Sequence, residues 1–222
     1  MDPLRQDLLA RMRPDLIAAD DAPWQQRKSS DTRVRILEAT IDCIVEKGYA
    51  RLSTNAVTQR AGVSRGAMHH HFPSRMALVG AVIDYNFYQR MRQFLADYFA
   101  AAEGADDRIV VEVAAERHWL SVTSRHYSAY IELAVAARTD VELNLHFLPA
   151  AQRFDRVWTE QMMQAFPQWQ SRWDALRVAN DFAVAAHMGL VLQQPAIDDA
   201  QRVDAVRALI ADVLERLRTD GP

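Results

Sequence analysis

The sequence predicts an all-α protein. Apolar residues recur every three or four positions through most of the chain, which is the period of an amphipathic helix. No segment of any length alternates apolar and polar residues as a half-buried strand does. Glycine, proline and serine fall between the periodic segments, where helices begin and end. We therefore expect an N-terminal helix-turn-helix domain of three helices, followed by a larger helical domain.

Residues 1–30 are expected to form a flexible arm. Pro14 would break any helix that precedes it, because proline lacks a backbone N–H group and clashes with the turn before it. Pro23 and the polar run Gln25–Ser30 then predict a linker. The arm carries acidic residues and no long apolar stretch, so it does not have the pattern of a secretory signal.

Residues 31–91 are expected to begin and end with longer helices. The first carries an apolar stripe from Val34 to Val45 and is closed by Gly48, a residue that commonly follows the last turn of a helix. The last opens at Pro73–Ser74 and is expected to reach about Tyr88.

Two short helices joined by a tight turn are predicted between them. Ser53 and Ser64 can each cap the start of one helix, and Gly62 supplies the turn. Ala61 is small enough for the helices to approach, and Val63 can fill the corner between them. Such a unit can place its second helix in the major groove of DNA. The same arrangement is also common in helical bundles that bind no DNA.

Five further helices are expected after residue 105, at about 106–120, 123–138, 140–166, 169–193 and 199–218. The last carries an apolar stripe from Val203 to Leu217. Two such helices from each of two subunits can form a four-helix bundle around a two-fold axis, so we expect a homodimer through the last two helices. The alternative is that the stripe packs inside one subunit.

The composition indicates a cytoplasmic globular protein. Half of the 222 residues are apolar and a quarter are charged. The longest nearly apolar run, Phe182–Leu192, is too short to span a bilayer, so we expect no membrane contact. A single cysteine, Cys43, fits a reducing compartment.

The net charge of −3 hides an uneven distribution of charge. No acidic residue occurs from Gly48 to Gly80. Residues 27–80 hold nine basic and four acidic side chains, a net charge of +5, which leaves −8 for the remainder. A local positive surface on an acidic body suits the binding of DNA phosphates. A solvated surface with a chance excess of arginine is the alternative.

Motifs in this region resemble the DNA-binding domain of the TetR family over about residues 31–91. They are Arg35-Ile36-Leu37-Glu38-Ala39, Gly48-Tyr49, Leu52-Ser53-Thr54, Ala61-Gly62-Val63-Ser64, Gly66-Ala67-Met68 and His71-Phe72-Pro73-Ser74-Arg75. The later helices resemble the family only in number and length. The resemblance implies a homodimeric regulator, in most cases a repressor, that binds double-stranded operator DNA and leaves it when a small-molecule effector binds. Residues 92–222 would then form the effector-binding and dimerisation domain.

The resemblance also implies a set of DNA contacts. These are Ser53, Thr54, Asn55, Arg65, Gly66, Ala67, His69, His70, His71 and Arg75. Arg65 is the best candidate for reading guanine, because its forked side chain can bond O6 and N7 together; a phosphate contact is its alternative. The chain departs from the family at His69, where a tyrosine is usual, and at Met76, where a glutamate is usual. Protonation of the three histidines, whose ordinary pKa is about 6.5, would strengthen DNA binding in mild acid.

No metal site and no cofactor are expected. Adjacent side chains on a helix point about 100° apart, so three consecutive histidines cannot easily share one ion. No spacing suggests a nucleophile with its base, or a phosphate-binding loop, and we expect no enzymatic activity. A small enzyme, or a helical adaptor that binds a ligand without DNA, is the alternative function.

A set of aromatic, Met and His residues in the C-terminal part could line an effector pocket. The candidates are Trp119, His126, Tyr127, Tyr130, His146, Phe147, Trp158, Met162, Phe166 and His187. Ordinary packing is the alternative for each of them. Because no dense charged cluster lies among them, we expect a mostly apolar or aromatic ligand.

Overall fold

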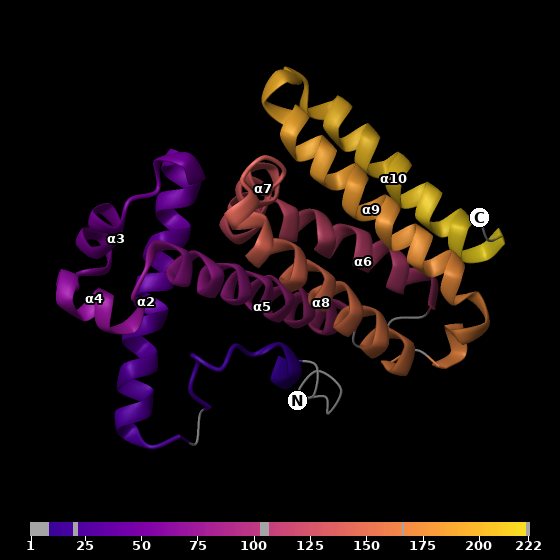
Figure 1. Ribbon diagram of the computed structural model, residues 1–222. Helices are drawn as coiled ribbons and strands as arrows, with labels where there is room; N and C mark the ends of the chain where they lie inside the picture. Colours follow the sequence, from indigo (N-terminus) through magenta and orange to yellow (C-terminus); the bar gives the residue numbers. More distant parts are fainter. Residues whose placement is uncertain (1–8, 20–21, 103–106, 166, 221–222) are drawn as a thin grey trace. The chain divides into compact units, whose positions relative to one another are not determined.

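The protein is all-α, as predicted. The computed structural model describes residues 9–19, 22–102, 107–165 and 167–220, and no β-strand occurs among them (Figure 1). The α-helices are α2 (Trp24–Lys47), α3 (Thr54–Ala61), α4 (Arg65–His71), α5 (Arg75–Ala102), α6 (Asp107–Val122), α7 (Arg125–Ala137), α8 (Val141–Ala165), α9 (Trp173–Gln193) and α10 (Ala200–Asp220). Short 3₁₀ turns are η1 (Tyr49–Arg51), η2 (Pro167–Arg172) and η3 (Gln194–Ala196).

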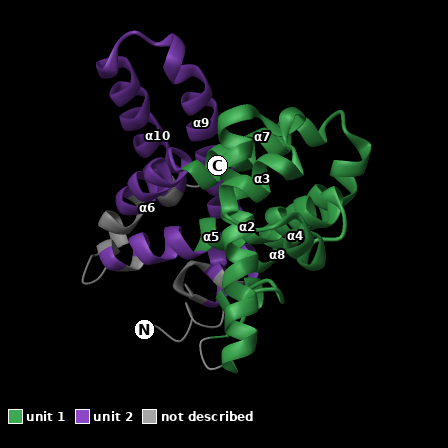
Figure 2. Cartoon of the chain, turned by 90° about the vertical axis from the view of Figure 1, so that its left-hand side faces the viewer, with its two compact units in different colours: residues 1–91, 125–157 green, residues 92–124, 158–222 purple. Residues whose placement is uncertain are grey.

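The chain forms two compact units (Figure 2). The first contains Met1–Met91 and Arg125–Val157, and the second contains Arg92–Ser124 and Trp158–Pro222. Helices α5 and α8 each begin in the first unit and end in the second. The predicted boundaries 1–30, 31–91 and 92–222 divide the chain by function, and that division stays a prediction.

The first long helix begins earlier than the sequence suggested. Gln25–Ser30 is not a linker but the first turns of α2, because glutamine, lysine and arginine favour helix and Pro23 occupies the position before its first turn. Ser30 is buried, and its Oγ accepts a hydrogen bond of 3.0 Å from the backbone N–H of Ala18. Leu16 and Ile17 pack against the core of the first unit. The rest of the predicted arm, residues 1–8 and 20–21, lies outside the described residues.

The helix-turn-helix forms through the predicted caps. The side chains of Ser53 and Ser64 accept hydrogen bonds from the backbone N–H groups of Ala56 (3.3 Å) and Ala67 (3.1 Å). Gly62 adopts the left-handed conformation (φ +64°), which a residue with a Cβ atom occupies only at a cost.

Met68 on α4, together with Phe72, belongs to the same buried core as Leu37 and Ile41 of α2. The short helix α4 is thereby fixed on its inner side and leaves its other side to solvent.

Helix α5 is much longer than expected. It continues from Arg75 to Ala102 without interruption, whereas the sequence predicted an end near Tyr88. No glycine or proline follows Gly80 within it, and buried residues recur at helical spacing at Phe87, Met91 and Leu95. The helix therefore provides one continuous rod from the helix-turn-helix into the rest of the chain.

The second unit is built from α6, α9 and α10, and α9 and α10 run side by side (Figure 1). Their small core contains Ala115, Ala179, Ile210 and Leu214. The stripe predicted on α10 divides between inside and outside: Val203 and Ile210 are buried, and Val206 is exposed.

One segment of this unit, Gln170–Ala196, is long and apolar enough to cross a membrane by length and composition alone. The shorter run considered in the sequence, Phe182–Leu192, is therefore part of a longer apolar segment. Less than a quarter of the most apolar part of Gln170–Ala196 is buried within the chain. Core helices of soluble proteins meet the same criterion, so the finding identifies α9 as an apolar helix with little cover of its own.

Candidate functional site

The outer side of the helix-turn-helix carries most of the predicted DNA contacts. Ser53, Thr54 and Asn55 are exposed at the start of α3. On α4, the residues Arg65, Gly66, His69 and His70 are exposed, and Ala67 and His71 are half-buried. The structure thus gathers these nine residues on the two short helices, and their contact with DNA stays a prediction.

The arginines of the acid-free segment differ in how they are held. Arg60 forms a two-pronged ion pair with Glu46, at 2.5 and 2.6 Å. The Nε of Arg51 donates a hydrogen bond of 2.9 Å to the carbonyl of Lys47. Arg65 is exposed and has no hydrogen bond or ion pair with another described residue. Its guanidinium is therefore available to an external partner.

Arg75 is held inside the protein by Tyr49. Its guanidinium lies 4.6 Å from the centre of the Tyr49 ring and donates hydrogen bonds to the hydroxyl (3.1 Å) and the carbonyl oxygen (3.3 Å) of that residue. The Tyr49 hydroxyl in turn donates to Oδ2 of Asp140 at 3.3 Å. Asp140 also caps α8 through the backbone N–H of Leu143. The predicted phosphate contact of Arg75 would have to compete with these bonds.

The three histidines are not equivalent. The ring of His71 is half-buried and lies 5.3 Å from that of His70. Burial, and then the nearby charges of His70 and Arg33, lower the pKa of His71. Its protonation therefore requires a lower pH than the ordinary value of 6.5. The proposed strengthening of DNA binding in mild acid stays a prediction.

The predicted pocket residues fall into two groups. His126, Tyr127, Tyr130, His146 and Phe147 belong to the first compact unit; Trp119, Trp158, Met162 and His187 belong to the second. Phe166 lies outside the described residues.

The first group adjoins a half-buried arginine that sequence analysis did not select. The guanidinium of Arg90, on α5, lies 4.0 Å from the ring centres of both Tyr127 and Tyr130. Phe87 and Phe154 stand 5.6 and 5.7 Å from it. Tyr130 also stacks on Phe147, with ring centres 5.8 Å apart. One cation surrounded by rings gives no sequence signal, because its neighbours come from three separate helices.

The second group contains a histidine pair. Nδ1 of His118 lies 2.9 Å from Nδ1 of His187, and the rings stack 5.2 Å apart. His187 is only 2% exposed, and burial lowers its pKa to about 4. Trp119 packs against the ring of His187, and the Arg207 guanidinium lies 5.0 Å from the Trp119 ring. His187 is thus neutral at physiological pH, and its role in a ligand site stays a prediction.

A carboxylate network that the sequence did not reveal joins α2 to α5 and α7. Glu38 of α2 pairs with Arg125 and accepts a hydrogen bond from the Tyr85 hydroxyl. Nε2 of His126 lies 3.6 Å from Oε1 of Glu38. Burial by itself would raise the pKa of Glu38, but the nearby His126 ring, the hydrogen bond from Tyr85 and the charge of Arg125 lower it to about 2. The network fastens the first helix of the helix-turn-helix to the helices behind it.

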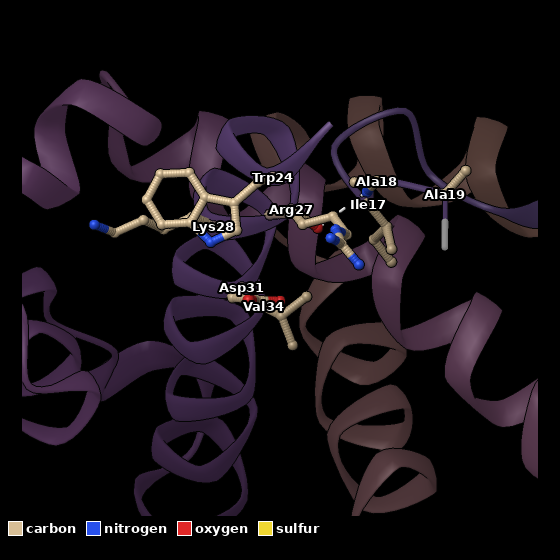
Figure 3. A pocket seen from close by; sticks show the side chains of 9 residues that line it. Ile17, Ala18, Ala19, Trp24, Arg27, Lys28, Asp31 and Val34 are labelled. Atoms are coloured by element: carbon tan, nitrogen blue, oxygen red, sulfur yellow. Dashed lines mark hydrogen bonds between the residues drawn. The ribbon is translucent and has the colours of Figure 1, made fainter. Parts of the chain in front are cut away.

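A hollow of about 730 Å³ lies beside the start of α2 (Figure 3). Ile17 and Ala18 line it from the segment before α2, and Arg27, Lys28 and Asp31 line it from the helix. The Lys28 ammonium lies 5.1 Å from the ring of Trp24, which is 64% exposed. Its charged and polar lining differs from the enclosed apolar pocket expected for an effector.

Comparisons with known proteins agree with this geometry. Residues 36–82 match the model of the tetR family of bacterial regulatory proteins. An uncharacterized HTH-type transcriptional regulator from Mycobacterium tuberculosis (strain ATCC 25618 / H37Rv) is 31% identical over 203 residues, which are 85% of this chain and 97% of that protein.

Solved structures of the same fold include a transcriptional regulator from Rhodococcus sp. Rha1, with a TM-score of 0.56 and 20% identity over 82% of this chain and 95% of that chain. A TetR family transcription regulator from Marinobacter aquaeolei VT8 gives a TM-score of 0.57 and 15% identity over 84% of this chain and 97% of that chain. The helix-turn-helix and the relative that spans most of the chain lead to one assignment. The chain belongs to the TetR family of bacterial DNA-binding transcriptional regulators.

Proposed function

We propose that this regulator is a repressor that a small-molecule effector releases from its operator. The observation that carries the proposal is the position of Arg65. It stands at the first turn of an exposed helix whose inner side is fixed to the core through Met68, and no other described residue engages its guanidinium. A forked donor on a fixed helix end suits the edge of guanine in the major groove.

Helix α5 is the element that would carry the effector signal. Its first turn follows α4 directly, and Arg90 stands fifteen residues further along the same helix. At 1.5 Å per residue, about 22 Å separates the two positions. Because one rigid helix contains both, a ligand that moves the Arg90 region would also move the attachment of α4.

Tyr49 connects the starts of α5 and α8 and would carry the same effector signal. It binds Arg75 at the start of α5 and Asp140 at the start of α8, the helix that carries Phe147 and Phe154. A shift of α8 relative to α5 would strain these bonds. We expect the effector to prefer an arrangement in which the recognition helices of a dimer no longer match the spacing of the DNA half-sites.

Dimerisation would use the outer faces of α9 and α10. Large apolar side chains are exposed there, at Val178, Phe182, Leu192, Val206 and Leu209. Members of this family bind operator DNA typically as dimers, and a second copy would cover this surface. Because the apolar helix α9 would then be covered by protein, we assign the chain to the cytoplasm.

The proposal is tested by DNA binding of Arg65→Ala. The full-length protein is expected to select a roughly palindromic sequence from a genomic library, and its affinity should fall as salt concentration rises. Arg65→Ala should lower the affinity for the selected site by about 1–3 kcal/mol and relax the preference at one base pair of each half-site. Fluorescence anisotropy with the selected duplex and its single-base variants measures both effects.

Arg92→Ala is the matched control, because Arg92 is an exposed arginine of α5 that we place in no DNA contact. It should bind like the wild-type protein. A wild-type protein that binds no duplex in a salt-dependent manner would instead favour the adaptor or the small enzyme. If Arg65→Ala lost the same affinity for every sequence, Arg65 would contact a phosphate and not a base.

A further inference from the structure

Arg90 is the most unusual polar residue of the first unit. Its guanidinium is enclosed by the rings of Tyr127, Tyr130, Phe87 and Phe154, which come from α5, α7 and α8. Its Nε and Nη1 atoms are out of contact with solvent and have no hydrogen-bond partner among the described residues. No described carboxylate forms an ion pair with it.

A half-buried arginine whose Nε and Nη1 donors have neither solvent nor a partner is costly to the fold. Buried charges in proteins are normally paired, because removal of an ion from water is repaid only by a counter-charge and by hydrogen bonds to all its donors. The faces of aromatic rings attract the cation but leave the in-plane N–H donors unused. Burial also lowers the pKa of Arg90, which reports the same unfavourable environment.

A second unsatisfied polar group lies one turn away on the same helix. Asn86 is only 2% exposed, and its Oδ1 atom has no hydrogen-bond partner among the described residues. Residues four apart share one face of a helix, so Asn86 and Arg90 are neighbours on α5. The oxygen and nitrogen of an asparagine amide can exchange places, and the group can therefore present a donor or an acceptor.

We propose that Arg90 binds a carboxylate of the effector, with Asn86 as a second polar contact and the surrounding rings in contact with an apolar, aromatic body. This inference rests on the proposed function and specifies the chemical class of the effector. A carboxylate matches the forked guanidinium with two parallel hydrogen bonds. One negative charge neutralises the one buried cation, whereas a doubly charged phosphate would leave a buried excess of charge.

The inference narrows the ligand class expected from sequence. The sequence suggested an apolar ligand because no dense charged cluster was visible, but a single arginine inside aromatic surroundings is enough to select an anion. The competing explanation is that Arg90 is a packing residue, fixed by its rings. The two explanations predict opposite effects of its replacement on stability.

The test compares carboxylates with their neutral amides on the DNA-free protein. The pairs are benzoate and benzamide, 2-naphthoate and 2-naphthamide, and 3-phenylpropanoate and 3-phenylpropanamide. At least one carboxylate should raise the melting temperature in a concentration-dependent manner and bind at least about tenfold more tightly than its amide. Isothermal titration calorimetry measures the affinities.

Two variants locate this preference. Arg90→Met should lose the selectivity for the carboxylate and melt at the same or a higher temperature than the wild-type protein, because the buried charge is gone. Arg92→Met, which replaces an exposed arginine of the same helix, should keep the selectivity. A lower melting temperature of Arg90→Met together with unchanged ligand selectivity would overturn the proposal in favour of packing. The absence of any carboxylate-specific stabilisation across the three pairs would overturn it as well.

DNA binding is measured separately, so that the two proposals can fail independently. A protein that selects an operator but shows no preference for carboxylates refutes only the inference about Arg90. A protein that binds carboxylates through Arg90 but no DNA refutes the proposed regulator and leaves the ligand site standing. Release of the selected operator by a carboxylate, and not by its amide, is the result expected when both proposals hold.

Discussion

Glu38 illustrates how a single carboxylate can hold several helices together. It lies on α2 and receives Arg125 and His126 from the start of α7 and Tyr85 from α5. All three contacts favour its charged form, and they outweigh the effect of burial, so its pKa falls to about 2. The stability of the first unit should therefore depend on the ionisation of this residue.

We predict that Glu38→Gln lowers the free energy of unfolding at pH 7 by about 1–3 kcal/mol. A carboxylate whose pKa is 4.5 when unfolded and about 2 when folded contributes its full stabilisation above pH 4.5 and loses it as the pH falls toward 2. The difference between wild type and variant in urea unfolding should accordingly shrink between pH 4.5 and pH 2.

The exposed residue Glu112 on α6 offers a control, since Glu112→Gln should leave the free energy of unfolding nearly unchanged. A difference between wild type and Glu38→Gln that stays constant down to pH 2 would contradict the role of charge. The loss would then come from packing alone.

The inner side of α4 is fixed to the core through Met68, whereas its exposed side contains Gly66, a residue that disfavours helix. Gly66 lies in its first turn, and a Cβ atom added there would meet only Ser64 Oγ, at 3.9 Å. The fold therefore leaves room for alanine, which favours helix by up to about 1 kcal/mol over glycine. A close approach of the backbone to DNA would account for glycine at this exposed helical position, and this stays a prediction.

We predict that Gly66→Ala raises the free energy of unfolding by up to about 1 kcal/mol while it weakens operator binding by about tenfold. Thermal or urea unfolding and fluorescence anisotropy measure the two effects on the same preparation. Gly189→Ala in α9, where an added Cβ has nothing within 4 Å, should stabilise the subunit to a similar degree and is the control for the effect on stability alone. Unchanged DNA affinity in Gly66→Ala would show that the backbone does not approach the duplex at this position.

The helix-turn-helix could be predicted closely from sequence because its signals are local. Ser53, Gly62 and Ser64 act on backbone groups within three residues of themselves, and the structure confirms each of these caps and turns. The start of α2 was missed because its first turns are polar, and Ser30 is tied to Ala18, a contact across twelve residues. A pattern of adjacent residues does not contain such a contact.

The candidate ligand site was predictable only in part, for the same reason. Aromatic residues at helical spacing pointed to Tyr127, Tyr130 and Phe147. In the structure Tyr127 and Tyr130 face Arg90, and Phe147 stacks on Tyr130. The same pattern also selected Trp119 and His187, which belong to the other compact unit. Arg90 itself was missed because an arginine on an amphipathic helix is normally solvated, and only the packing of three helices places aromatic rings around its guanidinium.

The molecule as a whole is expected to work as a pair of chains. A single helix-turn-helix reads only a few base pairs, and two of them held about 34 Å apart can read both halves of a palindrome. We expect the second unit to supply the surface for this pairing, since its core is small while Phe182 and Leu209 remain exposed on neighbouring helices. A substitution that prevents this pairing should therefore weaken DNA binding.

We predict that Leu209→Glu converts the dimer to a monomer, because it places a charge at the centre of an apolar interface, where it would have no partner. Leu209 is 61% exposed in the single chain, so the substitution should leave the fold of the subunit intact. Light scattering after size-exclusion chromatography should show the mass halved, with an unchanged circular dichroism spectrum. Operator affinity should fall by about 100-fold or more, because the second half-site no longer benefits from linkage to the first.

The control is Leu145→Glu, which changes a similarly exposed leucine on α8 of the first unit. It should remain dimeric if the interface is formed by α9 and α10. A Leu209→Glu variant that stays dimeric would show that the two-fold axis lies elsewhere. A monomeric variant with full operator affinity would show that DNA recognition does not require the dimer. The combination of monomer, intact fold and lost affinity follows only if the apolar surface of the last two helices sets the distance between the two recognition helices.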